Sequence, residues 1–176
     1  MSTMPEFKTD PKRDATDSIR GYVYQAYQSV LAWMQLKENE ILVLEGAEDF
    51  DVRCDTSITT TQVKDVSRNL TLRSQDVVDT INNFWTHCDC NPDYKIILRF
   101  LTTAEAGQEQ GSPFGSSQKG LEYWNGSDIA GTDIELLRTF LLTLALKPNL
   151  SSFVQEATVD ELREKLFRRI KWVIYQ

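Results

Sequence analysis

The chain has 176 residues, of which 41% are hydrophobic and 10% aromatic, a composition typical of one globular domain and not of a disordered segment. Its formal net charge of −7 disfavours a general nucleic-acid coat protein, because phosphate binding depends on clustered Lys and Arg, but it does not exclude an enzyme whose acids hold a metal. No apolar run reaches the roughly 20 residues of a membrane-spanning helix, and the first residues lack the apolar core of a signal peptide, so we expect a cytoplasmic protein with no membrane partner.

The first part of the chain predicts a polar tail, a helix and three strands. Residues 1–15 are assigned to the tail. Over residues 16–37 apolar side chains recur at spacings of three and four, which predicts an amphipathic helix whose apolar face holds Ile19, Val23, Ala26, Val30 and Met34. The apolar run from Ile41 to Leu44 predicts a strand buried on both faces. The segments "DFDVRC" and "SITTTQVKD" predict two further strands, because they are rich in β-branched residues or alternate in polarity.

A second helix and a fourth strand follow. Ser74 is placed to cap a helix that carries apolar residues at helical spacing: Val77, Val78, Ile81, Phe84 and Trp85. The segment "YKIILRFLTT" then predicts a strand. The order through residue 103 is therefore αβββαβ, and we assign residues 16–105 to the core of the domain.

The remaining residues predict a loop and two helices. The segment "AEAGQEQGSPFGSSQKG" holds four of the eight glycines and predicts a flexible loop over residues 106–120. One helix is expected near residues 132–146, and a second is opened by the capping box Thr158 to Glu161, with Leu162, Leu166, Ile170 and Val173 directed inward. Residues 121–176 are assigned to a helical extension of the same domain. The apolar ending "WVIYQ" predicts that further domains follow in a longer parent protein.

Four polar side chains occupy the second and third predicted strands. Because side chains alternate across a strand, Asp49 and Asp51 are expected on one face of the second strand, and Gln62 and Lys64 on one face of the third. If the strands pair through a turn near residues 54–57, the acids come to lie beside the amide and the ammonium group. The ordinary alternative is a half-exposed hairpin whose polar residues face solvent.

Together these residue types suit the hydrolysis of a phosphodiester. Mg²⁺ is bound by one or two protein carboxylates together with waters and substrate phosphate. A bound metal lowers the pKa of water and offsets charge on the phosphate oxygens. A lysine ammonium beside it stabilises that charge or orients the attacking water.

The order αβββαβ, with an acid in the second strand and x-Q-x-K in the third, resembles the PD-(D/E)XK restriction-endonuclease fold in its Mrr-like variant, where Gln replaces the second acid. The chain is more closely similar to the N-terminal double-stranded DNA endonuclease domains of bacterial antiphage effectors of the CBASS and STAND-NTPase types. This likeness rests on "GYVYQ" in the first helix, "LEGAEDFDV" and "TQVKD", and it covers roughly residues 18–103. It implies a restriction-endonuclease-like α/β core with a mixed central sheet and additional C-terminal helices.

The resemblance also implies a role for each candidate residue. Asp49 corresponds to the metal-binding acid, Gln62 to the second ligand position and Lys64 to the catalytic lysine. Asp51 is the alternative metal ligand. The other candidates are two acids close enough to assist, and two residues of the first helix that line the site: Glu45, Glu48, Tyr22 and Gln25.

The activity implied by the resemblance is Mg²⁺-dependent cleavage of double-stranded DNA, with Mn²⁺ as an alternative metal, in the cytoplasm of a bacterium. The family context implies sensor or NTPase domains in the parent protein and a homo-oligomer in the active state. Neutral Gln62 and the acidic charge favour a second interpretation, a catalytically silent module of the same fold that serves binding or oligomerisation. Hydrolysis of RNA or of a nucleotide is a third.

Overall fold

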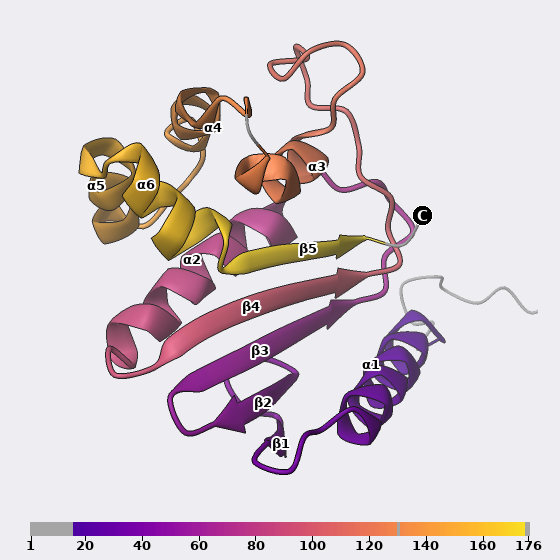
Figure 1. The fold of residues 1–176 in the computed structure, drawn as a ribbon. Helices are drawn as coiled ribbons and strands as arrows, with labels where there is room; N and C mark the ends of the chain where they lie inside the picture. Colours follow the sequence, from indigo (N-terminus) through magenta and orange to yellow (C-terminus); the bar gives the residue numbers. More distant parts are fainter. Residues whose placement is uncertain (1–15, 130, 175–176) are drawn as a thin grey trace, which may run out of the picture.

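The structure, a computed structural model, describes residues 16–129 and 131–174, and the predicted tail at residues 1–15 lies outside them. Its elements follow the predicted order αβββαβ and then continue with short helices and a fifth strand (Figure 1). The first six are α1 (Thr16–Met34), β1 (Ile41–Leu44), β2 (Phe50–Cys54), β3 (Ser57–Lys64), α2 (Gln75–Cys90) and β4 (Lys95–Thr102). The others are α3 (Gly120–Asn125), η2 (Gly126–Asp128), α4 (Ile134–Leu141), α5 (Pro148–Glu156), α6 (Val159–Leu162), η3 (Arg163–Phe167) and β5 (Ile170–Ile174).

The strands form one five-stranded mixed sheet in the order β1-β2-β3-β4-β5, which confirms the expected α/β fold with a mixed sheet. β1, β2 and β3 are antiparallel neighbours, whereas β3, β4 and β5 run parallel. A tight turn joins β2 to β3, with Cys54 paired to Ser57 as the sequence predicts. α2 supplies the crossover from β3 to β4, which parallel neighbours require.

The two faces of the sheet are covered unequally (Figure 1). On one face α2 and the C-terminal helices enclose the main core, into which β4 directs Leu98 and Phe100. On the other face α1 covers a smaller cluster of Phe50, Val63 and Leu101. Because side chains alternate along a strand, these residues assign every position of β3 and β4 to the α1 face or the α2 face.

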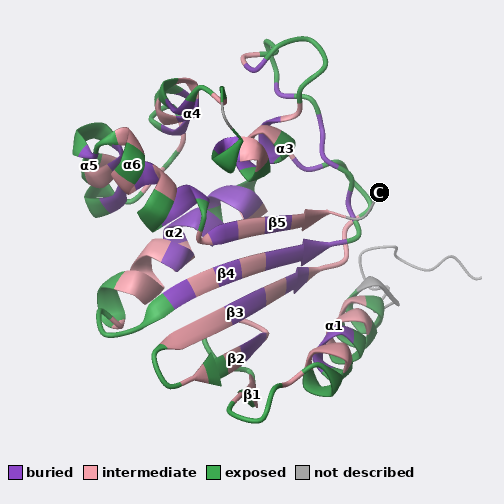
Figure 2. Ribbon diagram, viewed as in Figure 1, coloured by how far each residue is buried: buried purple, intermediate pink, exposed green. Residues whose placement is uncertain are grey.

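α1 packs on the sheet through the side opposite its apolar face. Tyr24 and Ala32 pack against the smaller cluster, and Gln28 and Ser29 on the same side of the helix are buried. The apolar face predicted from the spacing is exposed instead, as the outer side of α1 shows in Figure 2. The helix is amphipathic, but its apolar face is not covered by any part of the chain that the structure describes.

β1 is an edge strand, so the prediction of a strand buried on both faces is wrong. Ile41 is 67% exposed and Leu44 is 59% exposed. β2 is the only strand paired with β1 among the described residues. A continuous apolar run is typical of a central strand, and here it leaves apolar side chains at the edge of the sheet.

The predicted final helix is shorter than expected and is followed by a strand. Its capping box is confirmed: Thr158 Oγ1 accepts a hydrogen bond from Glu161 N, and the Glu161 carboxylate accepts one from Thr158 N. After one π-helical turn at η3 the chain extends, so Ile170 and Val173 lie in β5 and not on a helix. The predicted helix at residues 132–146 also ends early, as α4 stops at Leu141.

Tryptophan packing helps to hold residues Ile170–Ile174 in a strand. β5 pairs with the side of β4 that faces away from β3, and Trp172 then packs edge-on against Trp124 and Phe100, with ring centroids 5.6 and 5.5 Å apart. The extended backbone hydrogen-bonds β4, and the alternate side chains enter the main core. Residues 121–176 therefore supply a strand to the central sheet as well as helices.

Residues 107–119 contain neither helix nor strand, and buried side chains attach this segment to the core. Glu109 is 2% exposed, and its Oε1 accepts a hydrogen bond from Leu72 N at 2.6 Å. A Cβ at Gly120 would lie 2.6 Å from the same oxygen, so glycine permits the approach. Burial raises the pKa of Glu109. Phe114, further along the segment, is also buried.

Candidate functional site

Asp49 lies in the bend between β1 and β2, directly before β2 begins. Glu45 N donates to Asp49 O at 3.0 Å and closes the bend, and Glu45 has a φ of 51°, which is uncommon for a residue other than glycine. Asp49 Oδ2 accepts a hydrogen bond from Val63 N at 2.5 Å. The carboxylate thus binds a β3 backbone group just beyond the last β2–β3 pair, Phe50 and Thr61.

Three charged side chains act on the Asp49 carboxylate. Burial raises the pKa of Asp49, whereas the Val63 N–H and the positive charge of Lys64 oppose that rise. The negative charges of Glu48 and Glu45 add to it by repulsion. Asp49, Lys64, Glu48 and Glu45 therefore form one electrostatically connected set, which we call the Asp49 group.

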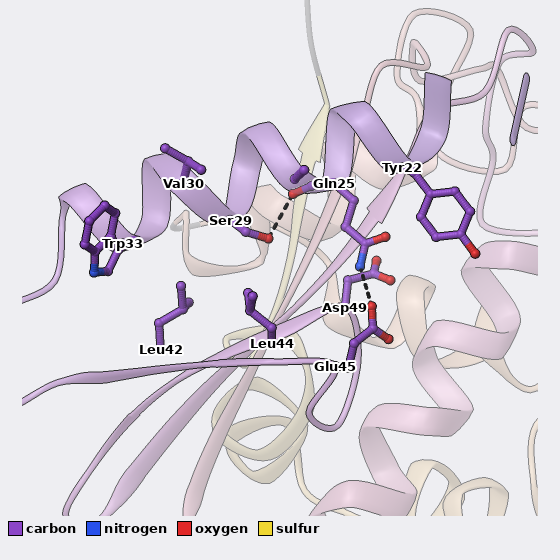
Figure 3. Close-up of a pocket in the computed structure, with 10 residues that line it drawn as sticks. Tyr22, Gln25, Ser29, Val30, Trp33, Leu42, Leu44, Glu45 and Asp49 are labelled. Atoms are coloured by element: carbon purple, nitrogen blue, oxygen red, sulfur yellow. Dashed lines mark hydrogen bonds between the residues drawn. The ribbon is translucent and has the colours of Figure 1, made fainter. Parts of the chain in front are cut away.

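A groove of about 450 Å³ between α1 and β1 leads to this group (Figure 3). Gln25 Nε2 donates to Glu45 Oε1 at 3.2 Å. Tyr22 lies one turn earlier on α1, is 70% exposed and also lines the groove. The structure therefore brings both predicted α1 residues to the same groove as Glu45 and Asp49.

Asp51 faces a different cavity from Asp49. It is fully buried, its Oδ2 accepts from Arg53 Nη2 at 2.6 Å and from Ala47 N at 3.1 Å, and it lines a cavity of about 250 Å³ beside α2. A Cβ at Gly46 would lie 2.2 Å from that oxygen, so the bend closes on Asp51 only with glycine there. The expected common face is not found because Asp49 precedes β2, where strand alternation does not apply.

Glu48 connects the bend to α2. Its Oε1 lies 3.0 Å from His87 Nε2 and 3.4 Å from Asn83 Nδ2. Neither the contact of Glu48 with His87 nor that of Asp51 with Arg53 was predicted. The only signal for the first pair was that His87 is the one histidine of the chain. The second pair could have been found from its spacing, because residues two apart on a strand share a face.

Gln62 lies on the α2 face of β3, where its side chain meets Thr80. Thr80 Oγ1 lies 2.6 Å from Gln62 Oε1 and 2.6 Å from the backbone oxygen of Asp76. Because a hydroxyl carries one proton, it donates to only one of them. The Gln62 amide oxygen is held against α2 by Thr80.

Lys64 ends β3 on the same α2 face as Gln62, since Val63 between them packs in the α1-side cluster. It is half-buried, and its charge reaches the Asp49 carboxylate. The structure thus joins Asp49 to Lys64 across the end of β3. Gln62 and Asp51 lie on the α2 side of the sheet.

The donor set at Asp49 suits a hydrated hard cation. Within residues 16–129 and 131–174, no group of three or more His, Cys, Asp or Glu is arranged to hold a metal ion. Mg²⁺ does not need such a cage, because one or two carboxylates suffice when waters and substrate phosphate complete the shell. The Val63 bond to Oδ2 leaves Asp49 Oδ1 for that purpose, with Glu45 and Glu48 close by. Asp51 fits less well, because Arg53 already pairs with its carboxylate.

Comparisons with known protein families, with curated proteins and with solved structures give no match to this chain. Among the described residues, none of the helices combines the length and apolar character that crossing a membrane requires.

Proposed function

We propose that this chain is a Mg²⁺-dependent endonuclease domain of the PD-(D/E)XK type that hydrolyses phosphodiester bonds of double-stranded DNA. One observation carries the proposal: Asp49, directly before the start of β2, accepts a hydrogen bond from Val63 N and interacts with the charge of Lys64 at the end of β3, in a sheet with the αβββαβ order. A carboxylate can hold the metal, and an ammonium group beside it can stabilise the charge that develops on the phosphate oxygens.

Each residue of the Asp49 group has a role in this proposal. Asp49 Oδ1 would hold the metal, Mg²⁺ or in its place Mn²⁺, with Glu45 or Glu48 assisting. When bound, the metal supplies a water of lowered pKa and offsets charge on the phosphate. Lys64 stabilises negative charge on the phosphate oxygens or orients the attacking water. Gln25 holds the Glu45 carboxylate through its 3.2 Å hydrogen bond.

The biological setting of the proposal rests on the sequence resemblance alone. It makes the domain a bacterial antiphage effector in the cytoplasm, joined to sensor or NTPase domains and active as an oligomer. The net charge of −7 supports the need for assembly, because an acidic domain binds DNA weakly by itself and several linked copies raise the effective concentration.

Plasmid cleavage tests the activity. We expect wild-type protein to cut plasmid DNA with Mg²⁺ and not with chelator, and Lys64→Ala to reduce the rate at least about 100-fold, the typical cost of losing one charge-stabilising group. Lys95→Ala is the matched control, because Lys95 is an exposed lysine at the opposite end of the neighbouring strand β4. Undiminished cleavage by Lys64→Ala would sink the assignment.

A second candidate, a catalytically silent module of the same fold, is favoured by the ion pair of Asp51. If Asp51 is the family's metal ligand, its carboxylate is already neutralised by Arg53 at 2.6 Å. The two candidates differ in metal binding, since a ligand that binds only the folded state raises the melting temperature. A melting temperature unaffected by Mg²⁺ or Mn²⁺, together with absence of cleavage, would identify the silent module.

A further inference from the structure

The outer side of α1 carries a continuous apolar surface, which we call the α1 surface. It consists of seven side chains of α1 and one of β1: Ile19, Tyr22, Val23, Tyr27, Val30, Trp33, Met34 and Leu44. Their exposed fractions range from 52% for Val30 to 75% for Met34. Monomeric proteins scatter such side chains singly, and a contiguous patch of this kind marks an interaction site.

Helical spacing places the α1 members of this surface on one side of the helix. Ile19, Val23, Tyr27, Val30 and Met34 recur at intervals of three and four residues, and Tyr22 and Trp33 widen this stripe on the same side of α1. Ala26, a small residue, lies in the middle of the stripe. A small residue at the centre of an apolar stripe lets a second helix approach closely.

The surface carries no charge. From Gly21 to Leu36 the sequence contains no Asp, Glu, Lys or Arg, in a chain of which 26% is charged. Nucleic acid binds through clustered Lys and Arg, and membrane-surface helices carry Lys and Arg along the polar face. The polar side of α1 instead holds buried Gln28 and Ser29, and Arg20 is paired with Asp65. The chemistry of α1 therefore matches neither phosphate nor an anionic lipid surface.

We propose that the α1 surface binds the α1 surface of a second copy of this chain, in a symmetric homodimer. Two copies with a charge of −7 repel each other over most of their surface, and they approach with least repulsion through an uncharged patch. In a two-fold dimer both partners use the same patch, so one uncharged, self-complementary stripe can form both halves of the interface. The two α1 helices then pack antiparallel about Ala26.

The size of the surface agrees with a dimer. At the exposures above, and taking about 150–250 Å² for a large side chain, the eight side chains offer on the order of 1,000 Å². A stable interface of standard size uses about 800 Å² from each partner. The groove between α1 and β1 is lined by Val30, Trp33 and Leu44 and gives a partner side chain a place to enter.

The dimer can be measured apart from the proposed catalysis, although four of its eight side chains line the groove that leads to the Asp49 group: Tyr22, Val30, Trp33 and Leu44. Its mass is measured without DNA or metal. Loss of cleavage and loss of the dimer are therefore separate results, and Lys64→Ala is expected to remain dimeric.

Sedimentation velocity over a roughly hundredfold range of protein concentration tests the proposal. We expect wild-type protein to have twice the chain mass at the upper end, and Val30→Glu to weaken the dimer by roughly 30-fold or more, as for a residue at the centre of an interface. Val30 is about half exposed, so its substitution leaves the fold intact, and an unchanged melting temperature verifies this. Ile129→Glu is the matched control, since Ile129 is 67% exposed and lies away from α1.

A second measurement tests the two-fold arrangement. In an antiparallel pair Ala26 lies near its own counterpart, so Ala26→Cys with a short bismaleimide should give a covalent dimer above the background of the native cysteines, and Ile129→Cys should not. A wild-type chain that stays monomeric at all concentrations overturns the proposal. So does a monomer that sediments with phosphatidylcholine–phosphatidylserine vesicles, or a dimer that Val30→Glu leaves unchanged.

Discussion

Asp49 and Asp51 are two residues apart, but different groups surround their carboxylates. Asp49 accepts one backbone hydrogen bond and senses the charge of Lys64. Asp51 is fully buried and paired with Arg53. The first arrangement leaves a carboxylate oxygen for a cation, whereas the second neutralises the carboxylate inside the protein. A metal-binding role and a structural role can therefore be separated by substitution.

We predict that Asp49→Asn removes the Mg²⁺-induced rise in melting temperature and leaves the fold intact, because the amide oxygen still accepts from Val63 N and burial already disfavours the charged form. Asp51→Asn should instead destabilise the fold by about 1–3 kcal/mol, since Arg53 loses its anionic partner, and should keep the Mg²⁺ response. Thermal melting of both variants with and without Mg²⁺ provides the measurement. The reverse pattern would make Asp51 the metal ligand and give Asp49 the structural role.

The sequence identified the polar residues of the candidate site, but it predicted only in part which face of the sheet each side chain occupies. Alternation along β3 correctly set Gln62 and Lys64 on one face, because both lie inside a strand. It failed for Asp49, because this residue lies in the bend. The contact of Glu48 with His87 joins residues 39 apart in sequence, and local periodicity carries no information on such a pair.

At the scale of elements, the periodicity of the sequence predicted that α1 is a helix, but it did not predict which side of the helix packs against the sheet. An apolar stripe is normally the buried side, because burial removes apolar area from water. In α1 the buried side holds Gln28 and Ser29. The stripe and the exposed edge strand β1 point outward together, as the proposed pairing with a second copy of the chain requires. β5 was missed for a related reason: "IKWVI" satisfies both a helical and a strand pattern, and only its pairing with β4 decides between them.

The 107–119 segment leads to a prediction about pH. Burial raises the pKa of Glu109, so the protonated form is favoured in the folded state. This contribution to stability is fully present below the ordinary Glu pKa of 4.5 and is lost as pH rises through the higher folded pKa. Glu109→Gln keeps an acceptor for Leu72 N without the charge. It should therefore melt a few degrees higher than wild type, about 2–4 °C, at neutral pH.

The difference between Glu109→Gln and wild type should shrink as the buffer is taken from about pH 8 to about pH 4, where both side chains are neutral. Melting curves across this pH range measure the difference in melting temperature. Because all other titrating groups are the same in both proteins, their effects cancel in this difference. A Gln variant that melts lower than wild type at neutral pH would show that the Glu109 charge stabilises the segment.

For the whole molecule, the acidic charge, the uncharged α1 surface and the groove act together. We expect the charge of −7 to weaken DNA binding by the separate domain and to disfavour contacts between copies except through α1. Part of the α1 surface lines the groove between α1 and β1, and Glu45 and Asp49 line the same groove. In the proposed dimer, pairing of two copies would fix the wall beside the Asp49 group and would place two such groups on one particle. Both effects would favour the proposed cleavage of a duplex.

We accordingly predict that cleavage depends on pairing. Below the dimer dissociation constant, the initial rate of plasmid cleavage should rise with about the second power of protein concentration, because the active species requires two chains. Val30→Glu should be slower at every concentration in this range, whereas Ile129→Glu should match wild type. Dimeric Lys64→Ala, added to wild type, should form mixed dimers and lower the rate. Initial rates that stay proportional to concentration, with Val30→Glu as fast as wild type, would mean that each chain cuts alone and that the dimer serves another purpose.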